Sequence, residues 1–222
     1  GVIYDRNEVP LAWNDESKTG EYFSHRSYAD MPGLAHILGY VSYPSKDAAG
    51  NYWREDFVGK DGLEKQYDEI LRGTNGATIV AVDAAGKIES SNIVDAPIPG
   101  ENLHLSIDSR VQSSLHSIIA TVAKSSKFIG GAGVIMNVKT GAILASASYP
   151  EYNSAIISAG DDSATITEYL HDSRKVFLNR TISGLYAPGS IVKPFIALGI
   201  LTEKIISPDK QIESTGSLTL PR

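Results

Sequence analysis

Two prolines and a glycine in the stretch DAPIPGEN, residues 95 to 102, divide the chain into two parts. Proline fixes φ and removes a backbone donor, so neither a helix nor a central strand continues through such a stretch. We therefore expect a domain boundary there, with one domain over residues 1–98 and a second over 99–222. The hydrophobic content of 42% is ample for a buried core.

Before this boundary, the apolar periodicity predicts a helix over residues 61 to 73, through Leu63, Tyr67, Ile70 and Leu71. Asp61 followed by Glu64 is typical of a capping box, and Gly73 is a stop signal. The next two β-rich runs, ATIVAVDA and KIESSNIV, flank an Ala-Gly turn. They predict an antiparallel hairpin within residues 77 to 98.

After the boundary, residues 103 to 108 predict a strand, and residues 109 to 126 predict a helix with Asp108 as its N-cap. One face of this helix is apolar, through Val111, Leu115, Ile118, Ile119 and Val122. A hairpin over residues 131 to 150 follows.

Residues 151 to 180 are polar and predict loops with short helices, and a last helix is entered from Pro188-Gly189. Helices mixed with antiparallel hairpins indicate an α+β fold.

The composition excludes several classes of function. A net charge of −6 without basic clusters argues against nucleic-acid binding, and the absence of cysteine excludes disulfides and thiol chemistry. The five histidines show no metal-ligand spacing, so we expect no metal and no cofactor. No apolar run is long enough to span a membrane. Because the chain starts at Gly1, we expect that an upstream segment with a membrane anchor was removed.

The stretch YAPGSIVKPF, residues 186 to 195, contains the residues of greatest chemical interest, Ser190 and Lys193. Positions three apart on a helix share a face, so we expect these side chains one turn apart. A serine hydroxyl becomes a nucleophile when a neighbouring base takes its proton, and a lysine amine can be that base. The helix N-terminus would favour a developing oxyanion, with the N–H of Ser190 as one donor.

A structural alternative fits the same spacing: Ser190 caps the helix and Lys193 is a solvated surface residue. The pattern S-x-x-K occurs by chance in many proteins, so the spacing alone favours this alternative. Pro194 cannot donate a hydrogen bond to the carbonyl of Ser190, which predicts a kink or a freed carbonyl at this point.

Six blocks of the chain settle this choice in favour of catalysis. The first three are GVIYDRNEVPLA, RSYADMPGLAHILGYVS and GKDGLEKQYDEILRGTNG. The other three are LHLSIDSRVQ, VIMNVKTGAILASASYPEYN and LNRTISGLYAPGSIVKP. In this order they resemble the class B penicillin-binding proteins, whose signature includes S-x-x-K. Glu8 stands where the family pattern has glycine, and the blocks around AHILGY and YAPGS are most similar to the elongation-type, penicillin-binding protein 2-like members.

The resemblance implies a non-catalytic, dimerisation-type pedestal over residues 1–98 and the N-terminal portion of a D,D-transpeptidase domain over 99–222. Ser190 would attack the D-Ala-D-Ala end of a peptidoglycan stem peptide, Lys193 would take its proton, and β-lactams would acylate the same serine. The implied partners are a SEDS-type glycosyltransferase and scaffold proteins of the elongation machinery, on the periplasmic side of the bacterial inner membrane.

Lys139-Thr140-Gly141 spells the third motif of this family, but we interpret it as a hairpin turn. It precedes Ser190 in the chain, whereas the functional motif of the family follows the serine. Ser90-Ser91-Asn92 and Ser214-Thr215-Gly216 are also poor matches to the missing motifs. Residues 1–222 alone are therefore not expected to be a working transpeptidase.

Two other functions remain open. The chain could be a non-catalytic docking module that uses an exposed apolar face of residues 26 to 43, or a serine β-lactamase or β-lactam sensor. Covalent penicillin labelling would exclude the first, and fast deacylation would favour the second. Among the remaining charged residues, we expect Asp5 and Arg6 to form an exposed pair, and Arg180 to clamp the two parts together.

Overall fold

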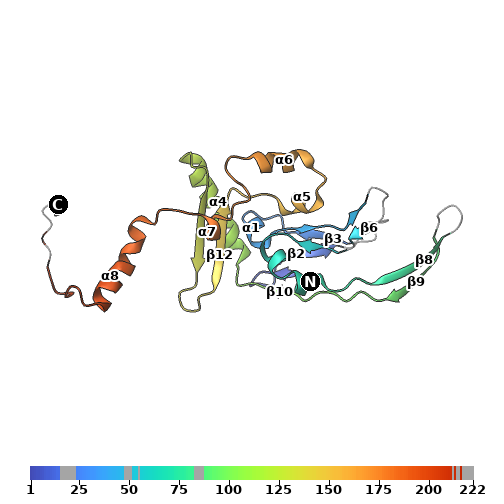
Figure 1. The fold of residues 1–222 in the computed structure, drawn as a ribbon, viewed down its shortest axis with the longest axis horizontal. Helices are drawn as coiled ribbons and strands as arrows, with labels where there is room; N and C mark the ends of the chain where they lie inside the picture. The colour runs from blue at the N-terminus through green and yellow to red at the C-terminus, as the bar shows by residue number, and fades with distance from the viewer. Residues whose placement is uncertain are drawn as a thin grey trace. The chain divides into compact units, whose positions relative to one another are not determined.

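The computed structural model (Figure 1) describes residues 1–15, 24–47, 52–54, 56–82, 88–211, 213 and 216. Its contacts divide the chain into two units, Gly1–Gly184 and Leu185–Arg222, which are described separately below. The mixture of helices and antiparallel strand pairs confirms the α+β class. The boundary at residues 98/99 stays a prediction.

A four-stranded sheet in the order β10-β1-β2-β3 forms the base of the first unit. Its strands are β1 (Ile3–Tyr4), β2 (Pro10–Asp15), β3 (His25–Tyr28) and β10 (Leu103–His104). β1 pairs in parallel with β10, and β2 is antiparallel to both β1 and β3. β10 is shorter than the predicted strand over residues 103 to 108, because its partner β1 is itself only two residues long.

The core of this part lies between the sheet and three short helices: α1 (Ala35–Leu38), α2 (Gly62–Gln66) and α3 (Asp68–Arg72). It joins Ile3, Leu11 and Ala12 from the strands to Leu34, Leu38 and Leu71 from the helical segments. Leu34 and Leu38 are only 3% and 1% exposed. The predicted docking face over residues 26 to 43 is therefore wrong, because its apolar side chains are the core.

The predicted helix over residues 61 to 73 is broken at Tyr67 into α2 and α3. Asp61 makes no side-chain cap; its carboxylate accepts a hydrogen bond from the Tyr152 hydroxyl at 3.0 Å instead. Glu64 is 3% exposed and accepts from Arg26 Nε at 2.7 Å, so the capping box is wrong. Gly73 ends α3 with φ of +71°, as predicted.

Among the described residues before 98, three further strand pairs are antiparallel. They are β4 (Val41–Ser42) with β7 (Val58–Gly59), β5 (Ser45–Lys46) with β6 (Tyr52–Arg54), and β8 (Ala77–Val82) with β9 (Ile88–Asp95). The β8–β9 pair confirms the predicted hairpin, although its Ala-Gly turn lies outside the described residues.

The long helix α4 (Ser109–Ser125) packs against the hairpin of β11 (Gly131–Met136) and β12 (Ile143–Tyr149), as seen in Figure 1. Asp108 caps α4 by accepting from the N–H groups of Arg110 and Val111, which confirms the predicted cap. The buried face of α4 coincides only in part with the predicted apolar face, of which Leu115 and Ile119 are half-buried against β11. Gln112 and His116 are buried, whereas Ile118 is 61% exposed.

Short helices follow, as the polar composition of residues 151 to 180 predicts: α5 (Ser154–Ala159), α6 (Ser163–His171) and α7 (Arg180–Ser183). The guanidinium of Arg180 is buried and donates to the carbonyls of Arg174, Lys175 and Leu178. Arg180 therefore holds the loop before α7, and the predicted clamp between the two parts of the chain is wrong.

Asp5 is completely buried rather than part of an exposed pair. Its carboxylate accepts from the N–H groups of Asn7 and Val9 at 2.7 and 3.0 Å, and from the N–H and hydroxyl of Ser109 at 3.1 and 2.8 Å. Burial opposes ionisation, but these hydrogen bonds outweigh it and lower the pKa of Asp5 to about 2. Asp5 thereby fixes the start of α4 to the loop after β1.

Candidate active site

The second unit begins its helical segment with a 3-10 turn, η1 (Gly189–Val192), which runs directly into α8 (Lys193–Thr202). Gly189 has φ of +57°, a left-handed conformation that glycine adopts without steric cost. The Pro-Gly pair therefore sets the direction in which the chain enters the helix, as the sequence predicts.

The 3-10 turn gives the Ser190 carbonyl a hydrogen-bond partner, although Pro194 cannot donate to it. The N–H of Lys193 donates to the carbonyl of Ser190, so that carbonyl has a partner without any contribution from Pro194. Pro194 lies in the first turn of α8, where an N–H has no intrahelical partner in any case. The predicted freed carbonyl is therefore wrong.

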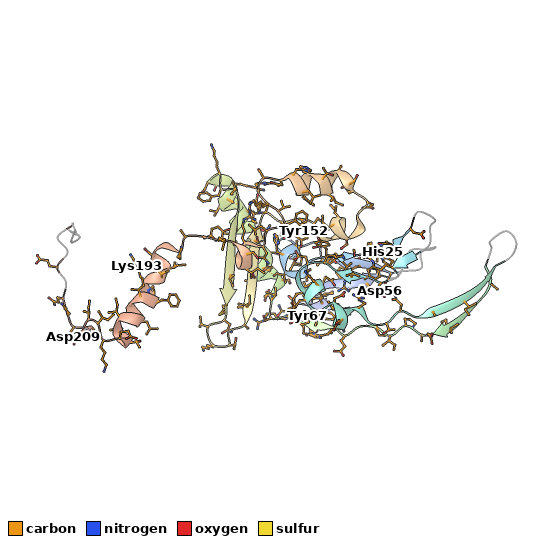
Figure 2. The ribbon with its side chains drawn as sticks, viewed as in Figure 1. His25, Asp56, Tyr67, Tyr152, Lys193 and Asp209 are labelled. Carbon is orange, nitrogen blue, oxygen red and sulfur yellow. The ribbon has the colours of Figure 1, made fainter. Side chains whose placement is uncertain are left out.

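Ser190 and Lys193 are both exposed within their unit (Figure 2 labels Lys193). Residues three apart eclipse in a 3-10 turn, so the backbone keeps these two positions on one side of the helix entry. Neither side chain has a hydrogen-bond partner in the part of the chain that the structure describes. Their catalytic roles stay predictions.

The rest of α8 is apolar all round, with exposed Phe195, Ile196, Leu198 and Leu201. A helix without a polar face is typical of the interior of a large domain rather than of a surface. This composition favours a place for α8 in the interior of a domain over that of a solvated surface helix.

Lys139, Thr140 and Gly141 form the turn between β11 and β12. Gly141 has φ of +75° and donates to the carbonyl of Asn137 at 2.8 Å, while Asn137 Oδ1 accepts from the N–H of Lys139 at 2.9 Å. The interpretation of this K-T-G as a hairpin turn is confirmed.

A buried polar junction, which the sequence does not predict, joins the α1 segment to α4 and β12. Gln112 is fully buried; its amide nitrogen donates to the carbonyls of Gly33 and Ser146, and its oxygen accepts from the N–H of Ser146 at 2.7 Å. The Tyr152 hydroxyl, which donates to Asp61, also lies 3.2 Å from the carbonyl oxygen of Ala35. These partners are far apart in sequence, so no local pattern could have indicated them.

Two histidines and a carboxylate belong to the same junction. His116 Nε2 lies 3.4 Å from Glu151 Oε1, and His36 Nε2 lies 3.3 Å from the carbonyl of Pro150. Burial lowers the pKa of both imidazoles and raises the pKa of Glu151. Near neutral pH, the neutral ring of His116 therefore lies beside this carboxylate.

Among the described residues, no group of three or more His, Cys, Asp or Glu side chains could hold a metal ion. None of the described helices is long and apolar enough to cross a membrane.

Two family models match the chain. Residues 21–105 match the penicillin-binding protein dimerisation domain, and residues 131–220 match the penicillin-binding protein transpeptidase domain. The peptidoglycan D,D-transpeptidase MrdA of Haemophilus influenzae is 31% identical over 209 residues, which are 90% of this chain and 31% of that protein. The chain thus spans about a third of the length of this relative.

Solved structures share the fold. Pseudomonas aeruginosa PBP2, in complex with WCK 5153, superposes with a TM-score of 0.73 at 29% identity, over 100% of this chain and 43% of that one. Helicobacter pylori PBP2, in complex with MreC, superposes with a TM-score of 0.72 at 23% identity, over 100% of this chain and 55% of that one. The second likeness concerns the fold alone.

Proposed function

This chain belongs to the class B penicillin-binding proteins of the PBP2/MrdA-like type, and we propose that the whole protein is a peptidoglycan D,D-transpeptidase. The chain combines a dimerisation domain with the start of a transpeptidase domain. The observation that supports the proposal most strongly is the position of S-x-x-K within the matched transpeptidase segment, at the entry of an apolar helix.

In the proposed reaction, Ser190 Oγ attacks the carbonyl carbon between the two D-alanines of a stem peptide. Lys193, in its neutral form, accepts the hydroxyl proton and passes it to the amine of the departing D-alanine. An ester then links Ser190 to the stem peptide, and the amine of a neighbouring stem peptide attacks this ester. The new amide cross-link forms as the hydroxyl of Ser190 regains a proton.

The helix entry suits this chemistry for two physical reasons. The N–H of Ser190 lies at the positive end of the η1–α8 segment, where it can donate to a developing oxyanion. Because Lys193 follows Ser190 by one 3-10 turn, the two side chains leave the backbone on the same side of the helix entry. Loss of such a general base slows a reaction by about 10² or more.

The cellular setting is part of the same proposal. We place the protein on the periplasmic side of the inner membrane, held by an anchor outside these 222 residues. There it would work with a SEDS-type glycosyltransferase and scaffold proteins of the elongation machinery.

Covalent labelling by a fluorescent penicillin tests the assignment in the full-length protein. We expect Ser190→Ala to abolish labelling, because Ser190 is the serine that stands in the S-x-x-K motif among the ordered family blocks. Ser183→Ala is the matched control: this serine is exposed on α7 and should leave labelling unchanged. Labelling of Ser190→Ala at another serine would refute the assignment, and rapid loss of the label from wild type would instead indicate a β-lactamase.

A further inference from the structure

The junction between the α1 segment, α4 and β12 contains three buried titratable side chains that the proposed acyl transfer does not use. His36 and His116 are 5% and 7% exposed, and the side chain of Glu151 is 16% exposed. Glu151 accepts from the N–H groups of Gly33 and Ala35 at 2.6 and 3.1 Å. These two hydrogen bonds tie the start of α1 to the segment after β12.

The same two hydrogen bonds connect the two matched family segments. Their donors lie within residues 21–105, which match the dimerisation domain, and Glu151 lies within residues 131–220, which match the transpeptidase domain. A change at this junction therefore alters how firmly the first segment is held to the second. The inference below concerns this attachment and does not depend on the role of Ser190.

His36 lies in a buried site on α1. Its Nε2 is 3.3 Å from the carbonyl of Pro150, and the ring of Tyr152, labelled in Figure 2, contacts it edge-on with centroids 5.4 Å apart. Of the charged groups around His36, Asp61 favours a positive ring and Arg180 opposes it. Burial is the largest effect and lowers the pKa of His36, so the ring is neutral near pH 7.

His116 faces the same junction from α4. Its Nε2 lies 3.4 Å from Glu151 Oε1 without a hydrogen bond, and the ring of Tyr149 is an edge contact at 5.7 Å. Burial, His36 and Lys124 each lower the pKa of His116, and burial raises the pKa of Glu151. A charged His116 ring would therefore lie in a buried site with positive neighbours.

We propose that this junction is an acid-sensitive latch, whose opening exposes His36 and His116 to water and lets both rings take up protons. In the open state the pKa of each ring returns to about 6.5, whereas in the closed state it is lower. Opening is therefore favoured as the pH falls below 6.5. Glu151 acts in the opposite direction, because its raised pKa lets the closed state keep a proton that the open state releases.

Two rings against one carboxylate leave a net uptake of about one proton on opening, so the opening equilibrium should rise about tenfold per pH unit. Hydrogen exchange of the full-length protein, followed by mass spectrometry, measures this rise once the intrinsic pH dependence of amide exchange is removed. The peptide over residues 31–38 contains the N–H groups of Gly33 and Ala35, and we expect its opening to increase about tenfold from pH 6 to pH 5. The peptide over β2 is the internal reference and should show no such increase.

Three variants separate the contributions. The double variant His36→Gln/His116→Gln should remove the rise in acid, because no ring is left to titrate. Glu151→Gln should steepen the rise towards about a hundredfold per pH unit, because the opposing carboxylate is gone. His171→Gln, at an exposed histidine on α6, is the matched control and should leave the rise unchanged.

The slope with pH is compared rather than the exchange rate, so a variant that exchanges faster at every pH still tests the latch. The wild-type result stands by itself if a variant fails to fold. An equal rise in the β2 peptide would mean global unfolding in acid and would overturn the proposal. Slower opening in acid, as an ion pair between His116 and Glu151 would give, or a rise that persists in the double variant, would also overturn it.

Discussion

Replacing Asp5 by asparagine should destabilise the first unit by about 2 kcal/mol at pH 7. The magnitude follows from the carboxylate, which is completely buried and accepts hydrogen bonds from Asn7, Val9 and Ser109. These bonds lower the pKa of Asp5 from 3.8 to about 2. One pKa unit is worth about 1.4 kcal/mol, so the ionised form contributes about 2 kcal/mol of folding stability.

The pH dependence of this contribution has a defined sign. The pKa of Asp5 is lower in the folded state than in the unfolded state, so the stabilisation is complete above pH 3.8. It is lost as the pH falls from 3.8 towards 2. The difference in unfolding free energy between wild type and Asp5→Asn should therefore shrink over this window.

Urea unfolding, followed by tryptophan fluorescence at pH 7 and again in acid, measures the loss of unfolding free energy in Asp5→Asn and its change with pH. Other carboxyl groups titrate in the same window, so the test is the difference between the two proteins and not the stability of either. Asp161→Asn, an exposed carboxylate, serves as the control and should stay within about 0.5 kcal/mol of wild type. A difference for Asp5→Asn that is near zero at pH 7, or that does not shrink in acid, would refute the reasoning.

Three further outcomes are expected. Glu8→Gly should raise the unfolding free energy by about 1 kcal/mol, because Glu8 has φ of +62° and a left-handed conformation strains any residue except glycine; a loss of stability in urea unfolding would contradict this. Glu64→Ala should lower the unfolding free energy by about 3–5 kcal/mol, because it leaves the buried Arg26 guanidinium without its carboxylate partner. Adding Arg26→Met should recover part of this loss, and no recovery would count against the ion pair. In the full-length protein, Lys193→Ala should slow penicillin acylation by about 10² or more, whereas Lys139→Ala should keep the acylation rate within a fewfold of wild type. Equal loss of rate in both variants would contradict the interpretation of Lys139-Thr140-Gly141 as a hairpin turn.

Local signals predicted the local structure well. The cap at Asp108, the stop at Gly73 and the turn at Gly141 each depend on the chemistry of one residue and its immediate neighbours, and each is confirmed. Local spacing, together with the ordered motifs, also indicated the candidate pair Ser190 and Lys193, whose catalytic roles stay predictions. The 3-10 turn that gives the Ser190 carbonyl its partner was missed, because S-x-x-K does not distinguish a 3-10 turn from an α-helical one.

Charged and polar residues with distant partners were misread. Asp5 bonds to Ser109, Glu64 bonds to Arg26, and Gln112 bonds to Gly33. For Asp5 and Glu64 the sequence favoured solvent or a local cap, because polar side chains are mostly exposed or bonded to nearby backbone, whereas it carried no prediction for Gln112. Only the tertiary fold brings these partners together, and one sequence contains no signal for that pairing.

The helix α4 shows why periodicity alone cannot decide which face is buried. Its apolar face was predicted correctly as a pattern, yet Ile118 and Val122 are 61% and 50% exposed, whereas Gln112 is fully buried. Burial of Gln112 costs little, because its amide bonds to the backbone of Gly33 and Ser146. A satisfied polar side chain can thus fasten one segment to another as firmly as an apolar one, and here it joins α4 to the loop before α1.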